Sequence, residues 1–197
     1  MRHFGVEHAR PVVEKAIQFK SRNVVGIGIG GDERRGPAEH FGDVYAYARN
    51  AGLRLTAHAG ETTGADCVRA SLDVLHAERI GHGLNAIHDR ALVERLAREQ
   101  IPVEICITSN IRTGCCGSLE SHPVRKLFDA GVLITLNTDD PAMFRTSLAR
   151  EYQLAQTAFG FTDPELRQLA QNSFRASFLP DSVKDRFTTE TRSHGNP

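Results

Sequence analysis

The sequence has no tryptophan, only two methionines and no excess of either charge. Lysine plus arginine number 24 among the 197 residues, and aspartate plus glutamate also number 24. A chain without net charge does not attract nucleic acid or an anionic membrane surface electrostatically. We therefore expect neither as a partner, and a small ligand that is neutral or of mixed charge instead.

Long apolar runs are also missing from the sequence. No stretch approaches the roughly 18 consecutive apolar residues of a membrane span. The first eight residues, MRHFGVEH, lack the apolar core of a signal peptide. The four cysteines, at positions 67, 106, 115 and 116, are not spaced like a zinc knuckle or a disulfide framework. These features predict a soluble protein of the reducing cytoplasm.

Strand-like and helix-like patterns alternate along the chain. Short apolar runs typical of buried strands occur at 24–29, 53–57, 79–81, 103–107 and 132–136, with helical periodicity between them. This alternation predicts a parallel α/β fold, formed by one domain over residues 1–180. We expect residues 181–197 to be a frayed C-terminal tail, because the final stretch TTETRSHGNP offers no apolar anchor.

A glycine-rich turn follows the first of these runs. Gly26, Gly28 and Gly31 match the G-x-G-x-x-G fingerprint of dinucleotide-binding folds. That fingerprint needs a helix that opens at the third glycine and an acidic residue about 20 positions further on. Here the charged loop DERRGP follows, and residues 50–56 contain no carboxylate. The glycines therefore indicate a strand end that requires positive φ.

Side chains capable of acid–base and metal chemistry follow three of the five runs. His58 and Glu61 come after the second run, His82 after the third, and the pair Asp139 and Asp140 after the fifth. In parallel α/β folds the carboxyl ends of the strands meet at one face, where active sites are built. A single histidine at a strand end can be structural, but two imidazoles and three carboxylates at strand ends predict a site.

These residue types suit a water molecule activated by a metal ion. Zinc takes neutral imidazole and carboxylate ligands and keeps a position open for water. His58 and one of Asp139 or Asp140 are the candidate ligands. Glu61, turned back toward the metal by Gly60, is placed to move protons. His82 lies between two glycines, which allows it to approach the water closely.

Six short motifs follow one another along the chain: GDE at 31–33, TAHAGE at 56–61, ERIGHG at 78–83, SN at 109–110, HP at 122–123 and LNTDDP at 136–141. In this order they resemble the motifs of the adenosine/adenine deaminase family of metal-dependent amidohydrolases. The resemblance covers residues 1 to about 180. It implies a partial (β/α)8 TIM-type barrel, from strand 3 or 4 to strand 8, and hydrolytic loss of the 6-amino group from an adenine-type ring, with one Zn²⁺ as cofactor.

The resemblance also implies roles for individual residues. His58 and Asp139 would be zinc ligands, Glu61 the proton donor to ring atom N1, and His82 the partner of the attacking water.

Two further residues would bind the purine. Asp140 would hold N7, and its carboxyl group would have to carry or share a proton because N7 is an acceptor. Gly31 would donate its backbone N–H to N3. On this interpretation the glycines bring the main chain close to a flat purine, not to a pyrophosphate.

The sequence departs from the family pattern at its beginning and around the substrate. The His-x-His pair of the family's first strand, which supplies two zinc ligands, does not occur in the 197 residues. The resemblance thus implies that a complete site needs a further N-terminal segment. The loop that usually reads Asp-Leu-Ala-Gly is Gly28-Ile-Gly-Gly31, and Ile107 replaces a proline. The substrate therefore stays open among adenosine, deoxyadenosine, adenine and larger adenine-bearing nucleosides.

Two rival functions also stay open at this stage. The chain could be a truncated, non-catalytic fragment that keeps the motifs without the metal. It could also catalyse another amidohydrolase reaction, such as hydrolysis of a phosphoester or a cyclic amide. Glu61, three residues after His58, counts against the second, because the phosphoester enzymes usually need a bridging lysine or a second metal.

Overall fold

The structure, a computed structural model, describes residues 2–193. The chain divides into two compact units, Met1–Val93 and Glu94–Pro197. In both units strands alternate with helices and pair in parallel. The parallel α/β fold expected from the sequence is confirmed, while the single domain over 1–180 stays a prediction.

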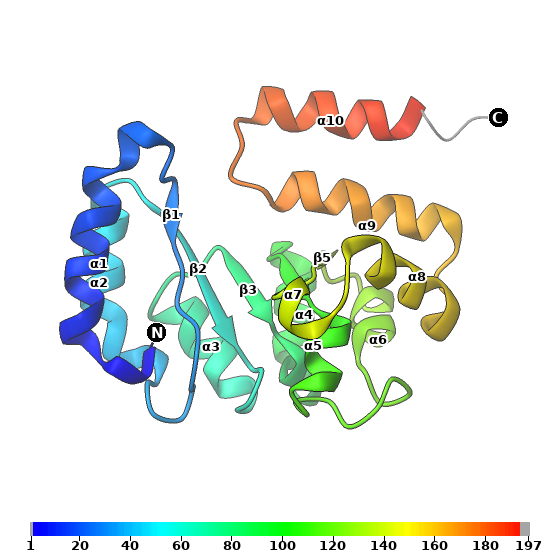
Figure 1. Cartoon of the computed structure of the whole chain (residues 1–197), viewed down its shortest axis with the longest axis horizontal. Coiled ribbons are helices and arrows are strands. Elements are labelled where there is room, and N and C mark those ends of the chain that lie inside the picture. The colour runs from blue at the N-terminus through cyan, green and yellow to red at the C-terminus, as the bar shows by residue number, and fades with distance from the viewer. Residues whose placement is uncertain (1, 194–197) are drawn as a thin grey trace. The chain divides into compact units, whose positions relative to one another are not determined.

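The first unit is built around three parallel strands (Figure 1). Strand β2 (Arg54–Ala59) pairs with β1 (Gly26–Ile27) on one side and with β3 (Arg79–His82) on the other. The helices of this unit are η1 (Arg2–Phe4), α1 (Val6–Gln18), η2 (Lys20–Arg22), η3 (Ala38–Phe41), α2 (Gly42–Asn50), α3 (Ala65–Asp73) and η4 (Leu84–His88).

Strand β2 forms because its side chains alternate between two faces. Leu55, Ala57 and Ala59 are buried in the core, while the residues between them are exposed or half-buried. Its register with β3 pairs His58 with Gly81 and Ala59 with His82. The carboxyl ends of the two strands therefore lie level with each other.

The second unit contains two parallel strands, β4 (Val103–Ile105) and β5 (Ile134–Leu136). The buried Asn172 side chain donates to the carbonyl oxygen of Ile134 at 3.0 Å and so ties a helix to β5. Helix α4 (Arg90–Glu99) begins in the first unit and ends in the second. The other helices are α5 (Ile107–Arg112), α6 (Val124–Asp129), α7 (Pro141–Phe144), α8 (Leu148–Phe159), α9 (Asp163–Ala176) and α10 (Asp181–Ser193).

One strand is shorter than its apolar run predicts. The run at 103–107 leaves the sheet at Ile105, and α5 begins at Ile107. The carbonyl oxygen of Cys106 accepts a hydrogen bond from the Asn110 N–H at 2.9 Å. Because that bond is helical, the last two apolar residues of the run pack as the start of a helix, which hydrophobicity alone does not reveal.

The frayed tail expected over 181–197 is wrong for residues 181–193, which form α10. Half-buried residues recur at 183, 184, 187 and 188, which is the spacing of one helix face. The Phe187 ring stacks on Phe174 of α9 with ring centroids 4.9 Å apart, and Figure 1 shows α10 beside α9. This aromatic anchor lies just before the polar stretch 188–197 on which the expectation was based. Residues 194–197 lie outside the described residues.

Within residues 2–193, no helix combines the length and the apolar character that crossing a bilayer requires.

Replacement of Leu55 by alanine tests how strongly β2 depends on its core. Leu55 is 1% exposed, so Leu55→Ala should lower the free energy of unfolding by about 2–5 kcal/mol, from lost burial and the cavity left behind. The matched control is Leu148→Ala, because Leu148 is 51% exposed and its loss should cost less than about 0.5 kcal/mol. Urea unfolding measures both. Equal losses would contradict the packing described for β2.

Candidate active site

His58 lies near the end of β2, and its ring is placed by two glycines. A Cβ atom on Gly81 would come within 2.7 Å of His58 Cδ2, and one on Gly30 within 3.3 Å of Nδ1. The two contacts lie on different edges of the ring. Glycine at both positions therefore leaves room for the half-buried imidazole.

Glu61 follows β2 after a tight turn at Gly60, whose φ is +66°. A Cβ atom there would meet Val68 Cγ2 at 2.7 Å. Only glycine satisfies both the left-handed backbone and this close approach. The turn brings the Glu61 carboxylate back toward the end of β3, with 15% of its side chain exposed.

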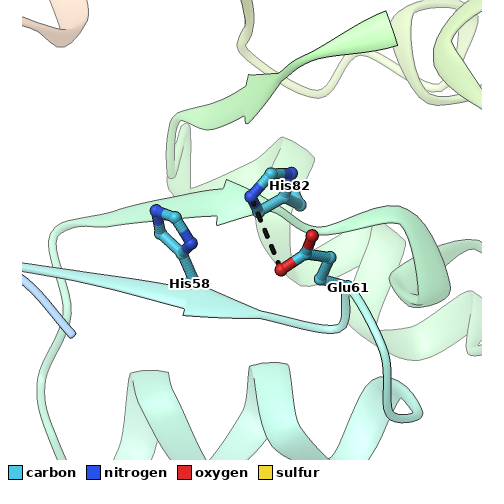
Figure 2. A group of neighbouring side chains, drawn as sticks. All are labelled: His58, Glu61 and His82. Carbon is cyan, nitrogen blue, oxygen red and sulfur yellow. Dashed lines mark ion pairs between the residues drawn. The ribbon is translucent and has the colours of Figure 1, made fainter. Parts of the chain in front are cut away.

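His82, the last residue of β3, is 2% exposed and has a φ of +65°. Left-handed backbone is unfavourable for a residue with a Cβ atom and is enriched at functional sites. The His82 ring meets the His58 ring edge-on, with centroids 4.6 Å apart. Its Nε2 atom lies 3.6 Å from Glu61 Oε2, as Figure 2 shows.

His58, Glu61 and His82 form the only group of potential metal ligands of this kind found within the described residues, with one ligand atom from each lying within 4.8 Å of the others. Zinc takes imidazole nitrogen and carboxylate oxygen as ligands. His58 offers such a nitrogen, while His82 Nε2 and Glu61 Oε2 lie 3.6 Å from each other beside it. The chemistry of this group therefore suits a zinc ion held by His58, with Glu61 and His82 next to it.

Gly31, the predicted contact to purine N3, has a φ of +103°. No described residue accepts a hydrogen bond from its backbone N–H. Gly31 and Glu61 line the same cavity of about 470 Å³, together with Asp32, Arg34 and Thr62. Gly31 and Glu61 therefore border one space large enough for a small ligand.

Glu33 was not assigned a role from the sequence, although it ends the GDE motif. It is 3% exposed, and its carboxylate accepts hydrogen bonds from residues 61–63. Burial alone would raise the pKa of the Glu33 carboxyl, but the bonds from the Thr63 hydroxyl and from three backbone N–H groups outweigh it and hold the pKa below its usual value. The sequence does not reveal that Glu33 is buried, because it stands in a run of four charged residues, 32–35, and such a run is typical of an exposed loop.

Asp139 and Asp140 belong to the second unit, in the loop between β5 and α7. Asp139 has a φ of +57°, and its Oδ2 accepts a 2.6 Å hydrogen bond from Ser109 Oγ. Asp140 accepts from the Met143 N–H at 3.0 Å and caps α7. Ser109 thus positions Asp139, a predicted zinc ligand, by a hydrogen bond. This role of Ser109 was not predicted from the sequence.

Two buried side chains hold the start of α5, which carries Ser109. Glu151 is 0% exposed, and it accepts from the Thr108 N–H at 3.1 Å and from Thr146 Oγ1 at 2.6 Å. His122 Nε2 lies 3.2 Å from Asn110 Oδ1, while its Nδ1 accepts from the Val124 N–H. Because Nδ1 is an acceptor, the ring is neutral with its proton on Nε2.

Comparison with known proteins identifies the family. The family model for adenosine deaminase matches residues 1–193. The chain belongs to the adenosine deaminase family. The resemblance seen in the sequence motifs is thereby confirmed.

Two similar curated proteins are described as adenine or adenosine/adenine deaminases. A putative adenosine/adenine deaminase of Streptomyces coelicolor is 44% identical over 178 residues, which cover 90% of this chain and 52% of that protein. An adenine deaminase of Rhizobium leguminosarum is 42% identical over 183 residues, covering 93% of this chain and 57% of that protein. The chain therefore spans about half the length of the curated relatives it matches.

Solved structures of the family share the fold. An adenine deaminase from Arthrobacter aurescens is 34% identical with a TM-score of 0.91, over 98% of this chain and 58% of that one. An amidohydrolase from Burkholderia ambifaria with bound zinc is 30% identical, with a TM-score of 0.90 over 96% of this chain and 53% of that one. An N6-mAMP deaminase from Arabidopsis is 33% identical, with a TM-score of 0.86 over 98% and 57%. The expected partial TIM-type barrel is confirmed.

The packing of the His58 ring gives a direct test of the site. Gly81→Ala forces a methyl group against that ring, so we expect the imidazole resonances of His58 to move and the free energy of unfolding to fall by about 1–3 kcal/mol. Gly64→Ala is the matched control, because a Cβ atom there has nothing within 4 Å. NMR of the imidazoles and urea unfolding measure both effects. Unchanged His58 resonances in Gly81→Ala would show that the ring lies elsewhere.

Neutral, buried His122 makes stability depend on pH. Burial lowers the pKa of His122 to about 4, against about 6.5 in the unfolded chain. The unfolded state therefore binds the extra proton first, so stability is highest above pH 6.5 and falls by roughly 3 kcal/mol as pH drops to 4. In His122→Gln this component of the slope should disappear. Urea midpoints at pH 7 and pH 5 compare the two proteins, and parallel losses would show that His122 is not responsible.

Proposed function

We propose that this chain supplies most of a zinc-dependent active site that hydrolyses the 6-amino group from an adenine-type purine. The observation that carries the proposal is the convergence of His58, Glu61 and His82 at the ends of β2 and β3, in a chain of the adenosine deaminase family. Hydrolysis of adenosine would yield inosine and ammonia.

His58 and Asp139 are the zinc ligands in this proposal. A zinc ion held by them and by further ligands would supply an activated water at neutral pH, because zinc lowers the pKa of bound water from 15.7 to about 7. The Ser109 hydroxyl donates to Asp139 and orients the carboxylate, as residues around metal ligands commonly do. The remaining ligands have to come from a segment that the 197 residues do not contain, because no His-x-His pair occurs in them.

Glu61 and His82 carry out the proton transfers in this proposal. Attack at ring carbon C6 breaks aromaticity, so a proton delivered to N1 by Glu61 allows the ring to accept the electron pair. His82 orients the attacking water and holds its proton, with its Nε2 atom 3.6 Å from the Glu61 carboxylate. The two groups therefore lie next to each other, where the proposal places the attacked edge of the purine.

Gly31 and Asp140 bind the ring. Gly31 and Glu61 line the same cavity, so in this proposal a purine with N1 at Glu61 presents N3 to Gly31 in the same space. One oxygen of Asp140 accepts from the Met143 N–H, which leaves the other for N7 when the carboxyl group carries a proton.

The substrate is a 6-aminopurine, and adenosine is the form we propose. Free adenine is the second candidate, because the Rhizobium and Arthrobacter proteins are named adenine deaminases. An adenine nucleotide is the third, because the Arabidopsis relative is an N6-mAMP deaminase. We also place the reaction in the cytoplasm, where the free thiols of the chain are stable.

Replacement of Glu61 by glutamine tests the proton donor. In the complete enzyme Glu61→Gln should keep its zinc, because Glu61 is not a ligand in the proposal, and should lose about 10²- to 10⁴-fold in turnover, since an amide cannot deliver the proton. Glu39→Gln is the matched control, because Glu39 is exposed and its loss should change neither value. The measurements are zinc content and the absorbance change with adenosine, adenine and AMP.

Two outcomes of this experiment would count against the proposal. If the Glu61→Gln variant kept more than about a tenth of the parent turnover, Glu61 would not be the proton donor. A complete, zinc-loaded enzyme that deaminates none of the three purines would refute the function itself. The 197-residue chain alone should hold less than one zinc ion and show no turnover, because two expected ligands are missing.

A further inference from the structure

The carboxylate of Glu33 accepts hydrogen bonds from the loop that carries Glu61. Its Oε1 atom accepts from the Glu61 N–H at 3.2 Å. Its Oε2 atom accepts from the backbone N–H groups of Thr62 and Thr63, at 3.1 and 2.7 Å, and from their hydroxyls, at 3.3 and 2.6 Å. Five donors from three consecutive residues thus converge on one buried side chain.

We propose that Glu33 is a positioning residue that fixes the direction of the Glu61 side chain, so that the Glu61 carboxylate stays next to His82 Nε2. The inference rests on the proposed function of Glu61. Residues 60–63 form neither a helix nor a strand, so no regular hydrogen-bond ladder holds this backbone. Glu33 supplies the acceptors that such a ladder would otherwise provide.

An ionised carboxylate suits this role better than a neutral side chain. Hydrogen bonds to a charged acceptor are roughly twice as strong as those between neutral groups. Both oxygens of Glu33 face backbone N–H groups. A glutamine in either amide orientation would turn its own NH₂ group against one of them, so the charge and both acceptors are needed together.

Glu33 is itself held in place by its neighbours. Asp32 Oδ1 accepts from the N–H groups of Arg34 and Arg35, at 3.0 and 3.2 Å, and shapes the turn. The buried Arg2 side chain donates to the Gly36 carbonyl oxygen and, at 2.9 Å, to that of His58. The segment 30–36 is therefore connected to the backbone of both His58 and Glu61, and Glu33 provides the connection to Glu61.

The Glu33→Gln substitution in the 197-residue chain tests the proposal by NMR. The amide protons of Thr62 and Thr63 should exchange about 10- to 100-fold faster, because they lose a charged acceptor. The His82 imidazole resonances should move in the direction in which Glu61→Gln moves them, and the double variant should add little. Amides in β2 and β3 should keep their protection. Glu39→Gln, the same change at an exposed position, should alter none of these signals.

Other results would overturn the proposal. Equal loss of protection at 61–63 and throughout β2 and β3 would show a purely structural role, and unchanged His82 resonances in folded Glu33→Gln would show that Glu61 is held by other contacts. If Glu33→Gln does not fold, the Thr63→Val variant tests the proposal instead. That variant removes only the 2.6 Å hydroxyl bond and should shift His82 the same way, so unchanged resonances there reject the proposal. These readouts need no turnover, so an inactive complete enzyme contradicts the proposed function alone.

Discussion

The parallel register of β2 and β3 is the constraint on which the rest of the site depends. It pairs His58 with Gly81 and Ala59 with His82, which sets the two histidines one residue apart in register. With the left-handed backbone at His82, their imidazoles meet edge-on at 4.6 Å. A shift of one residue would send every side chain to the opposite face. The small residues Gly30 and Gly81 leave the space that the His58 ring fills.

Backbone conformation at the strand ends sets the direction of the functional side chains. His82 and Asp139 both adopt left-handed φ values without being glycine, and both are predicted site residues. Such conformations persist only where the surroundings enforce them. At His82 the enforcement includes hydrogen bonds from the Gly83 N–H to Ala59 and Gly81, and at Asp139 it includes the Ser109 hydroxyl.

Buried carboxylates hold the loops in each unit. In the first unit Glu33 accepts from residues 61–63. In the second, Glu151 accepts from the hydroxyl of Thr146, in the loop between α7 and α8, and from the N–H of Thr108 at the start of α5. Loops carry chemistry but lack the regular hydrogen bonds of helices and strands, so they need acceptors from elsewhere. Relatives described as an adenine deaminase and as an N6-mAMP deaminase share this fold.

The sequence by itself determined the α/β alternation, the family and the candidate residues at the strand ends, because hydrophobic period and short motifs are local signals. It did not reveal the role of Glu33, Ser109 or Glu151, and it mistook α10 for a frayed tail. Each of these depends on a partner elsewhere in the chain: Glu33 on residues 61–63, Ser109 on Asp139, Glu151 on Thr108, and α10 on the stacking of Phe187 on Phe174. Only the tertiary structure decides such pairs, because burial and hydrogen-bond partners arise when separate segments pack together.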